Sequence, residues 1–213
     1  MNTQSPPKIS IGQIEKQLRL RLSGYPPAAW GRKQTDDWDR QTRFIYHIAD
    51  WAELAQKIAP LDKPLADYAV HRWFNFWSAQ AVERMFCRLP GVQANLDPYD
   101  RLVDFSIRGI TFDHKTSVFP KRYGRTPRFA WQNRADLIGW LYRHQSRQQR
   151  FHTANRLFII LYNRAGQHWQ LRADLRGLYR VIEEYVTNFE PSKLVRVELD
   201  GTTALSDIIW LVR

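Results

Sequence analysis

The sequence contains a single cysteine, Cys87, among 213 residues. No intramolecular disulfide can therefore form, and a zinc site built on cysteines is not expected. No apolar run approaches the roughly 18 to 20 residues that a membrane-crossing helix needs. The first ten residues, MNTQSPPKIS, lack the basic and apolar segments of a signal peptide. These absences predict a soluble protein of the reducing cytoplasm with no membrane partner.

The sequence also lacks the short motifs of several common enzyme classes. It has no Walker A loop, no Rossmann glycine fingerprint, no G-x-S-x-G elbow and no H-E-x-x-H pair. It has no internal repeat and no low-complexity tract. Enzymes that depend on those motifs therefore lose support.

Basic residues outnumber acidic ones. The 32 Lys and Arg residues against 21 Asp and Glu residues give a formal net charge of +11. Such an excess attracts polyanions over long range, so nucleic acid is the favoured partner. A basic protein without that partner and an acidic membrane surface remain alternatives. With 44% hydrophobic residues, the chain is large enough to bury a substantial core.

The order of predicted elements indicates an α/β or α+β fold. Residues 1–64 form a predicted helical extension, and residues 65–213 form a predicted core of mixed strands and helices. The expected helices cover 11–22, an irregular stripe over 35–60, a strongly aromatic stretch at 65–88, then 133–150 and 175–185. The expected strands cover 102–107, 110–118, a buried run at 156–163 paired as a hairpin with 168–174, and two near the C-terminus at 194–199 and 207–212.

The segment LVDFSIRGITFDHKT, residues 102–116, predicts a β-hairpin with chemistry on one face. If Arg108-Gly109 is its two-residue turn, equal steps outward place Asp104 opposite Asp113. Strand alternation adds Lys115 to the same face and turns the phenylalanines to the other. Two facing carboxylates repel each other unless a cation lies between them. Oxygen ligands suit Mg²⁺ or Mn²⁺, which can activate water for attack on a phosphate.

Asp104 followed by Asp113-His114-Lys115 resembles the core of the PD-(D/E)XK, or restriction-endonuclease-like, nuclease superfamily. Val103 stands where the proline of that name would be. The resemblance covers about residues 65–213 and implies a central mixed sheet flanked by helices, with the acidic and D-X-K positions on adjacent strands. It implies a Mg²⁺- or Mn²⁺-dependent endonuclease that hydrolyses phosphodiester bonds of nucleic acid, with DNA favoured. It fits a restriction or phage-defence enzyme, which often acts as a homodimer.

The alternatives are a solvated hairpin with an incidental Asp-Lys pair, a protein on this fold that binds nucleic acid or a partner without cutting, and a helical adaptor.

Members of the superfamily often add a glutamate from the preceding helix, and Glu83 fits that position. Its alternative is an exposed glutamate paired with a nearby arginine. His114 is expected to contribute its backbone carbonyl to the metal, with its ring turned into the core. Lys115 is expected to orient or deprotonate the attacking water.

A basic stretch follows the proposed site. Between Phe119 and Arg150, Asp136 is the only acidic residue. The basic residues expected to hold phosphates are Lys121, Arg122, Arg125, Arg128, Arg134, Arg143 and Arg147. Tyr123, Phe129 and Trp131 are expected either to stack on bases or to belong to the core.

Overall fold

The computed structural model describes residues 7, 9–26, 36–97, 100, 102–145, 154–199 and 201–213. The chain divides into two compact units. The first contains residues 1–82 and 172–175, and the second contains residues 83–171 and 176–213. The division falls within helix α4 (Lys63–Phe86), beyond the boundary near residue 64 that the sequence predicted.

The first unit is helical. Helix α1 (Ile11–Gly24) begins at Ser10, whose hydroxyl accepts a hydrogen bond from the amide of Gln13 in a capping box. The predicted helical stripe over 35–60 is interrupted: it contains α2 (Asp36–Gln41), the 3₁₀ turn η1 (Arg43–Tyr46) and α3 (Trp51–Ile58). The carboxylate of Asp50 accepts from the amides of Ala52 and Glu53, so it starts a new helix after the interruption.

The second unit contains a six-stranded mixed sheet in the order β1-β2-β3-β4-β6-β5. The strands are β1 (Val92–Ala94), β2 (Phe105–Ile107), β3 (Ile110–Val118), β4 (Arg156–Tyr162), β5 (Val195–Leu199) and β6 (Thr202–Val212). Strands β3, β4 and β6 run parallel, while β2 and β5 run antiparallel to their neighbours. The predicted α/β or α+β class with a mixed sheet flanked by helices is confirmed.

The predicted hairpin between β2 and β3 is also confirmed. Ile107 pairs with Ile110 and Phe105 pairs with Phe112. Arg108 and Gly109 both have positive φ angles, 48° and 85°, as a tight two-residue hairpin turn requires.

The hairpin predicted after the buried run 156–163 is wrong. Residues 168–173 form the 3₁₀ helix η2 (His168–Ala173), and β4 pairs in parallel with β3 and β6. Six of the seven residues of β4 are buried. A strand buried on both faces has parallel neighbours reached through crossovers, which its continuous apolar run cannot reveal by itself.

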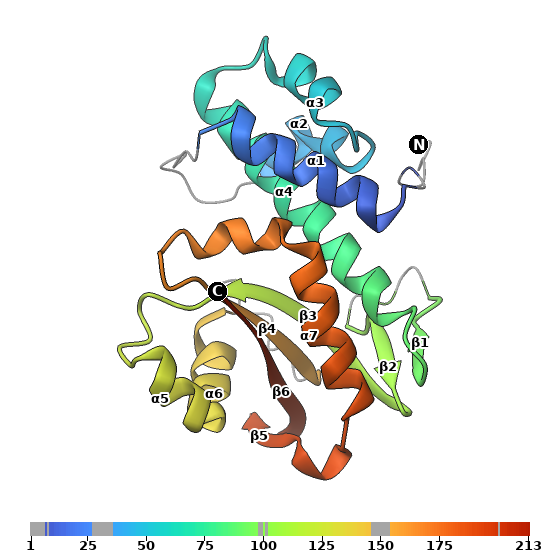
Figure 1. The fold of residues 1–213 in the computed structure, drawn as a ribbon, viewed down its shortest axis with the longest axis vertical. Helices are drawn as coiled ribbons and strands as arrows, with labels where there is room; N and C mark the ends of the chain where they lie inside the picture. Colours follow the sequence, from blue (N-terminus) through green and yellow to red (C-terminus); the bar gives the residue numbers. More distant parts are fainter. Residues whose placement is uncertain are drawn as a thin grey trace. The chain divides into compact units, whose positions relative to one another are not determined.

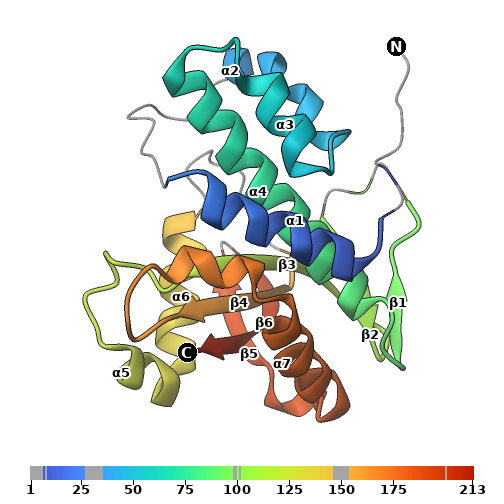
Figure 2. The ribbon, with the colours of Figure 1, turned by 45° about the horizontal axis from the view of Figure 1, so that its top comes forward.

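Helices cover both faces of this sheet. Helix α6 (Arg134–Gln145) follows the short α5 (Pro127–Gln132), and its apolar residues pack with Phe158 and Ile160 of β4. Helix α7 (Leu175–Thr187) leads to Phe189, whose ring meets that of Phe112. Figures 1 and 2 show α6 and α7 on opposite faces of β3, β4 and β6. No helix of the described residues is long and apolar enough to span a membrane.

Candidate functional site

The ladder between β2 and β3 becomes irregular at Asp104. The amide of Asp104 donates a 2.8 Å hydrogen bond to the carbonyl of Phe112, which is already the partner of Phe105. Two residues on one strand thus face one residue on the other, as in a β-bulge. A bulge interrupts the alternation of side chains, so Asp104 does not follow the pattern that the hairpin turn predicts.

The carboxylate of Asp104 is held by His114. Its Oδ2 atom accepts a 2.7 Å hydrogen bond from the His114 amide and lies 2.6 Å from Nδ1 of the same residue. Burial tends to raise the pKa of Asp104, but the hydrogen bonds and charge of His114 outweigh it and hold this pKa below its usual value. Asp104 is therefore an ionised carboxylate anchored at the end of β2.

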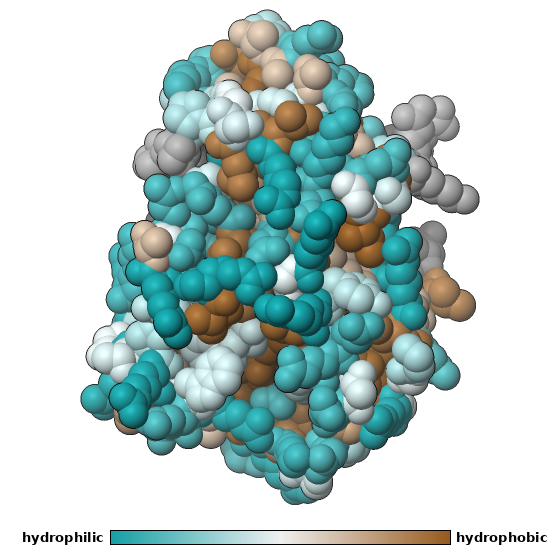
Figure 3. All heavy atoms as spheres, in the orientation of Figure 1, coloured by the Kyte–Doolittle hydropathy of each residue, from teal (hydrophilic) through white to brown (hydrophobic). Residues whose placement is uncertain are grey.

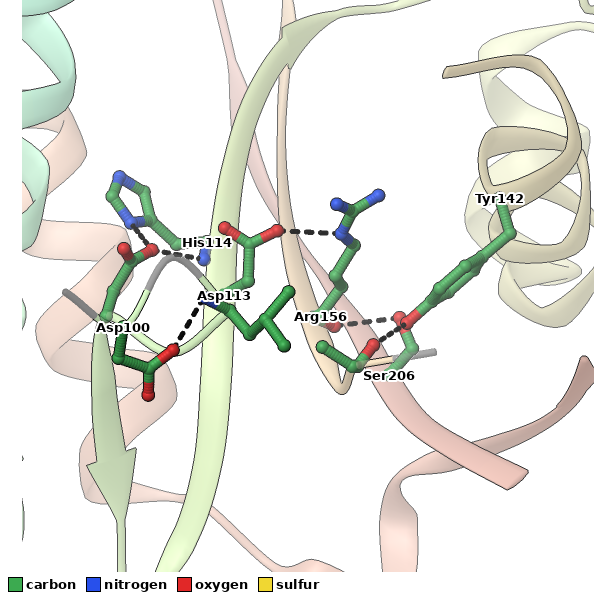
Figure 4. Close-up of polar contacts among 9 residues, drawn as sticks. Asp100, Asp113, His114, Tyr142, Arg156 and Ser206 are labelled. Carbon is green, nitrogen blue, oxygen red and sulfur yellow. Dashed lines mark hydrogen bonds and ion pairs between the residues drawn. The ribbon is translucent and has the colours of Figure 1, made fainter. Parts of the chain in front are cut away.

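Asp113 lies with a different partner. Its Oδ2 atom accepts a 2.7 Å hydrogen bond from Nε of Arg156, the residue beside it on β4. The guanidinium of Arg156 also lies 5.9 Å from the ring centroid of Tyr142 on α6. Figure 4 shows Asp113 reaching toward Arg156 while the ring of His114 extends to the other side of β3.

The prediction that Asp104 and Asp113 share one sheet face is therefore wrong. Asp104 joins His114, whose ring lies against those of Phe86 and Phe105, whereas Asp113 joins Arg156 on the side of α6. The bulge is the physical reason, because an extra residue reverses which face a side chain takes. The prediction that the His114 ring faces the core side is confirmed, while its carbonyl as a metal ligand stays a prediction.

The two faces meet at an open edge of β3. Pairing with β2 ends at Phe112, so within the described part of the chain β3 has a neighbouring strand only on the β4 side from Asp113 onward. Lys115 is exposed here, and its positive charge contributes to the lowered pKa of Asp104. Lys115 and Asp104 thus interact electrostatically around this edge although they start from different strands.

Glu83 adds a second carboxyl group beside Asp104. Burial raises the pKa of Glu83, and the negative charge of Asp104 raises it further. The charges of His114 and Arg84 act in the opposite direction. Helix α4 therefore brings Glu83 within electrostatic reach of Asp104, while its role as a third acid of the site stays a prediction. The neighbouring thiol of Cys87 has its pKa raised to about 11, first by burial and then by Glu83 and Asp104.

The acidic pair fits a hard cation, because a divalent ion would offset the repulsion between Glu83 and Asp104. Asp113 is directed at Arg156 and not at that pair. Across the described ranges, His, Cys, Asp and Glu side chains form no group of three or more placed to hold a metal ion.

The basic residues after β3 fall into different environments. Lys121, Arg122, Arg125, Arg128 and Arg143 are exposed. Arg134 is instead engaged within the protein, with Nη1 3.1 Å from Oδ1 of Asp207 and Nη2 donating to the carbonyl of Lys193. Arg147 lies outside the described residues.

The aromatic residues of this stretch also differ. Tyr123 is buried, and its hydroxyl donates a 2.5 Å hydrogen bond to Asp136, so it belongs to the core and is not placed to stack on bases. Phe129 is partly exposed and lies under the guanidinium of Arg125. Trp131 is 58% exposed.

Arg156 is the main participant that sequence reasoning missed. Its side chain is only 5% exposed, although it opens an otherwise apolar strand. A buried arginine needs an acidic partner, so the Arg in the string RLFIILY was the available signal. The partner itself, 43 positions away, had no signal in the local pattern.

Comparisons with protein-family models, with curated proteins and with solved structures find no match for this chain.

Proposed function

We propose that this chain is a metal-dependent nuclease that hydrolyses phosphodiester bonds in nucleic acid, with DNA the favoured substrate. The observation that carries the proposal is the open edge of β3, where pairing with β2 ends at Phe112 and the carboxylate of Asp104 interacts electrostatically with Glu83 and with Lys115. The adjacent strands, the preceding aromatic helix and the mixed sheet agree with a restriction-endonuclease-like core. The net charge of +11 favours the polyanionic substrate.

In this proposal Glu83 and Asp104 would hold Mg²⁺ or Mn²⁺, which when bound would supply charge neutralisation at the phosphate and a more acidic water. Lys115 is exposed and can orient the attacking water or take its proton. The water oxygen forms the new bond to phosphorus as the bond to the leaving ester oxygen breaks, and that oxygen receives a proton. His114 keeps Asp104 ionised and fixed in position through its amide and ring.

A second candidate function is binding of nucleic acid without cleavage. One observation favours it: both aspartates already have hydrogen-bond partners within the chain. Asp104 accepts from His114, and Asp113 accepts from Arg156. A site whose acids are neutralised internally does not need a metal to be stable. Cleavage would then require Asp113 to exchange Arg156 for another partner or to stay outside the reaction.

A cleavage assay separates the two candidates. Supercoiled plasmid and single-stranded oligonucleotides are incubated with the pure protein in Mg²⁺, in Mn²⁺ and in EDTA, and binding is measured in parallel in Ca²⁺. The nuclease proposal expects nicking or linearisation with either metal and none in EDTA. Binding without cleavage under all conditions would establish the second candidate instead.

Variants then test the site. Lys115→Ala should lower the cleavage rate by about 10² to 10⁴, the usual contribution of a positioned acid–base group, with binding retained. Lys57→Ala, which removes an exposed charge on α3, is the matched control and should cleave like the parent. Undiminished cleavage by the Lys115 variant would remove this lysine from the mechanism.

A further inference from the structure

A cavity of about 420 Å³ lies beside β6, at the end of β5. Strand β5 pairs with β6 only as far as Ser206, so in the described chain the following residues of β6 have no neighbouring strand on that side. The cavity is bounded by this edge, by α7 and by the end of α5, all within the second unit. Figure 3 shows hydrophobic side chains exposed over this region, between α7 and the α5–α6 segment.

The polar floor of the cavity is built around Asp207. This residue is only 5% exposed, and burial raises its pKa. Its carboxylate accepts hydrogen bonds from Arg134 Nη1 at 3.1 Å and from the Tyr185 hydroxyl at 3.3 Å. It also accepts from the amide of Ile208 at 2.8 Å, which satisfies the first backbone donor beyond the end of β5. Pairing of an added peptide strand at this point is therefore disfavoured.

The wall of the cavity is aromatic. Trp131 on α5 is 58% exposed, and its ring centroid lies 5.4 Å from that of Trp210 on β6, with an interplanar angle of 42°. A large exposed aromatic ring at the mouth of a cavity offers a stacking surface to a planar ligand. The volume is within the range of small-molecule sites.

The charges inside the cavity are nearly balanced. Arg134 is paired with Asp207, and Lys193 is paired with Glu190 at 2.7 Å. Glu184 adds one further carboxylate to the lining. Among the described lining residues each cation is thus paired with a carboxylate, which disfavours a phosphate in the interior. A neutral ring with hydrogen-bonding edges fits it better, because Glu184 and Asn188 supply acceptors.

Positive charge is available just outside the cavity. Arg128 is exposed and precedes Trp131 by three positions on α5, so the two side chains lie on the same face of that helix. A chain of phosphates held along α5 would thus present its bases toward the aromatic mouth. A cation for the phosphate beside an aromatic ring for the base is the pattern used by proteins that bind single-stranded nucleic acid.

We infer that this cavity takes one unpaired nucleobase of a nucleic-acid strand, stacked on Trp131, with the neighbouring phosphates on Arg128. The inference rests on the proposed nucleic-acid partner but not on cleavage. It adds a base-binding site at the free edge of β6, formed by residues other than those at the edge of β3.

The test uses the full-length protein in Ca²⁺ with two fluorescent single-stranded oligonucleotides, one normal and one made entirely of abasic sugar-phosphate units. Trp131→Ala should weaken binding of the normal oligonucleotide by about 5- to 100-fold, the usual effect of removing one stacking ring. It should leave the weaker binding of the abasic oligonucleotide unchanged, and Trp131→Phe should restore most of the loss. Tyr179→Ala, which removes a partly exposed aromatic ring on α7, is the control and should bind both like the parent.

Each other result overturns the inference in a distinguishable way. Equal affinity of Trp131→Ala and the parent for the normal oligonucleotide would exclude the base site while leaving the nucleic-acid partner intact. Parent binding to the abasic strand as tight as to the normal one would do the same. Binding of neither oligonucleotide by the parent would overturn both this inference and the proposed function.

Discussion

Asp113 and Arg156 sit side by side on two parallel strands, with Oδ2 of the aspartate 2.7 Å from Nε of the arginine. The arginine side chain is 5% exposed and the aspartate side chain is 22% exposed. The pair therefore holds a buried positive charge that the surrounding apolar strand could not accommodate alone. It also ties the carboxylate of Asp113 to the sheet interior.

Replacing Asp113 alone should destabilise the protein strongly, and replacing Arg156 as well should add less than the sum of the two single losses. Asp113→Ala leaves Arg156 buried without its partner, a loss on the order of 3 kcal/mol in the free energy of unfolding. A double-mutant cycle with Arg156→Ala should give a coupling of about 1 to 3 kcal/mol by urea denaturation. The exposed pair Arg40 and Asp37 is the control, with expected coupling below about 1 kcal/mol. Coupling no larger than in that pair would contradict the structural role.

Glu83→Gln should stabilise the protein at neutral pH when no divalent metal is added. The pKa of Glu83 is raised by burial and by the charge of Asp104, so its ionised form is disfavoured in the folded protein. Ionisation of Glu83 therefore lowers the stability of the folded protein. This loss is absent below the ordinary pKa of a glutamate, where the group is protonated in both states, and complete above its folded-state pKa. The gain in melting temperature should thus be present at pH 8 and vanish near pH 4.

The Glu83→Gln variant also tests whether Glu83 helps to bind a divalent cation. Mg²⁺ should raise the melting temperature of the parent at pH 8 more than that of Glu83→Gln, because ligand binding to the folded state adds stability. Cleavage by the variant should fall only partly, since Asp104 remains. Glu53→Gln, an exposed change on α3, should show neither a gain in stability nor a changed response to Mg²⁺. An identical response of parent and Glu83→Gln would return Glu83 to a structural role.

Replacing Arg122, Arg125 and Arg128 together should weaken nucleic-acid binding for all sequences alike. These three residues are exposed and are expected to contact phosphates. Each lost contact should reduce the slope of log affinity against log salt by about 0.9 for duplex DNA or about 0.7 for single strands. The measurement is a salt titration of binding in Ca²⁺. A loss confined to one preferred sequence would instead indicate that these residues read bases.

A matched triple variant controls for net charge. Arg19, Arg40 and Lys57 are exposed in the first unit, and their replacement by alanine removes the same three charges. We expect this variant to retain the salt slope of the parent. Equal slopes for both triple variants and the parent would mean that the basic stretch after β3 does not contact the nucleic acid.

His71 should make the first unit sensitive to acid. Burial, reinforced by the positive charges of Arg172 and Arg21, lowers the pKa of His71 to about 4 from 6.5. Between these values the unfolded chain binds the proton and the folded protein does not, so stability falls as pH falls from about 6.5 to about 4. His71→Gln should remove up to about 1.4 kcal/mol of this loss per pH unit. His47→Gln, an exposed change, should retain the pH dependence of the parent in urea denaturation.

The local pattern was a good guide wherever one short segment decides its own structure. The turn Arg108-Gly109 set the register from Ile107 to Phe112, because a two-residue turn with positive φ angles permits few pairings. The aromatic helix from 65 to 88 matches α4, which brings Glu83 close enough to Asp104 for the two charges to interact. The role of Glu83 as a ligand stays a prediction. The interruption before α3 was missed, although Asp50 carried the signal of a helix N-cap.

The sequence by itself determined the mixed helix–strand class, the β2–β3 hairpin and the burial of 156–162, since these follow from turn chemistry and from periodicity within a few residues. Only the tertiary structure decided where the site residues point. The bulge at Asp104 depends on pairing with Phe112, and the hold on Asp113 depends on a parallel neighbour 43 positions away. The cavity beside Trp131 exists because β5 ends before β6 does. These features depend on which distant strands meet and where each one stops, and side-chain periodicity along one strand carries no information on either.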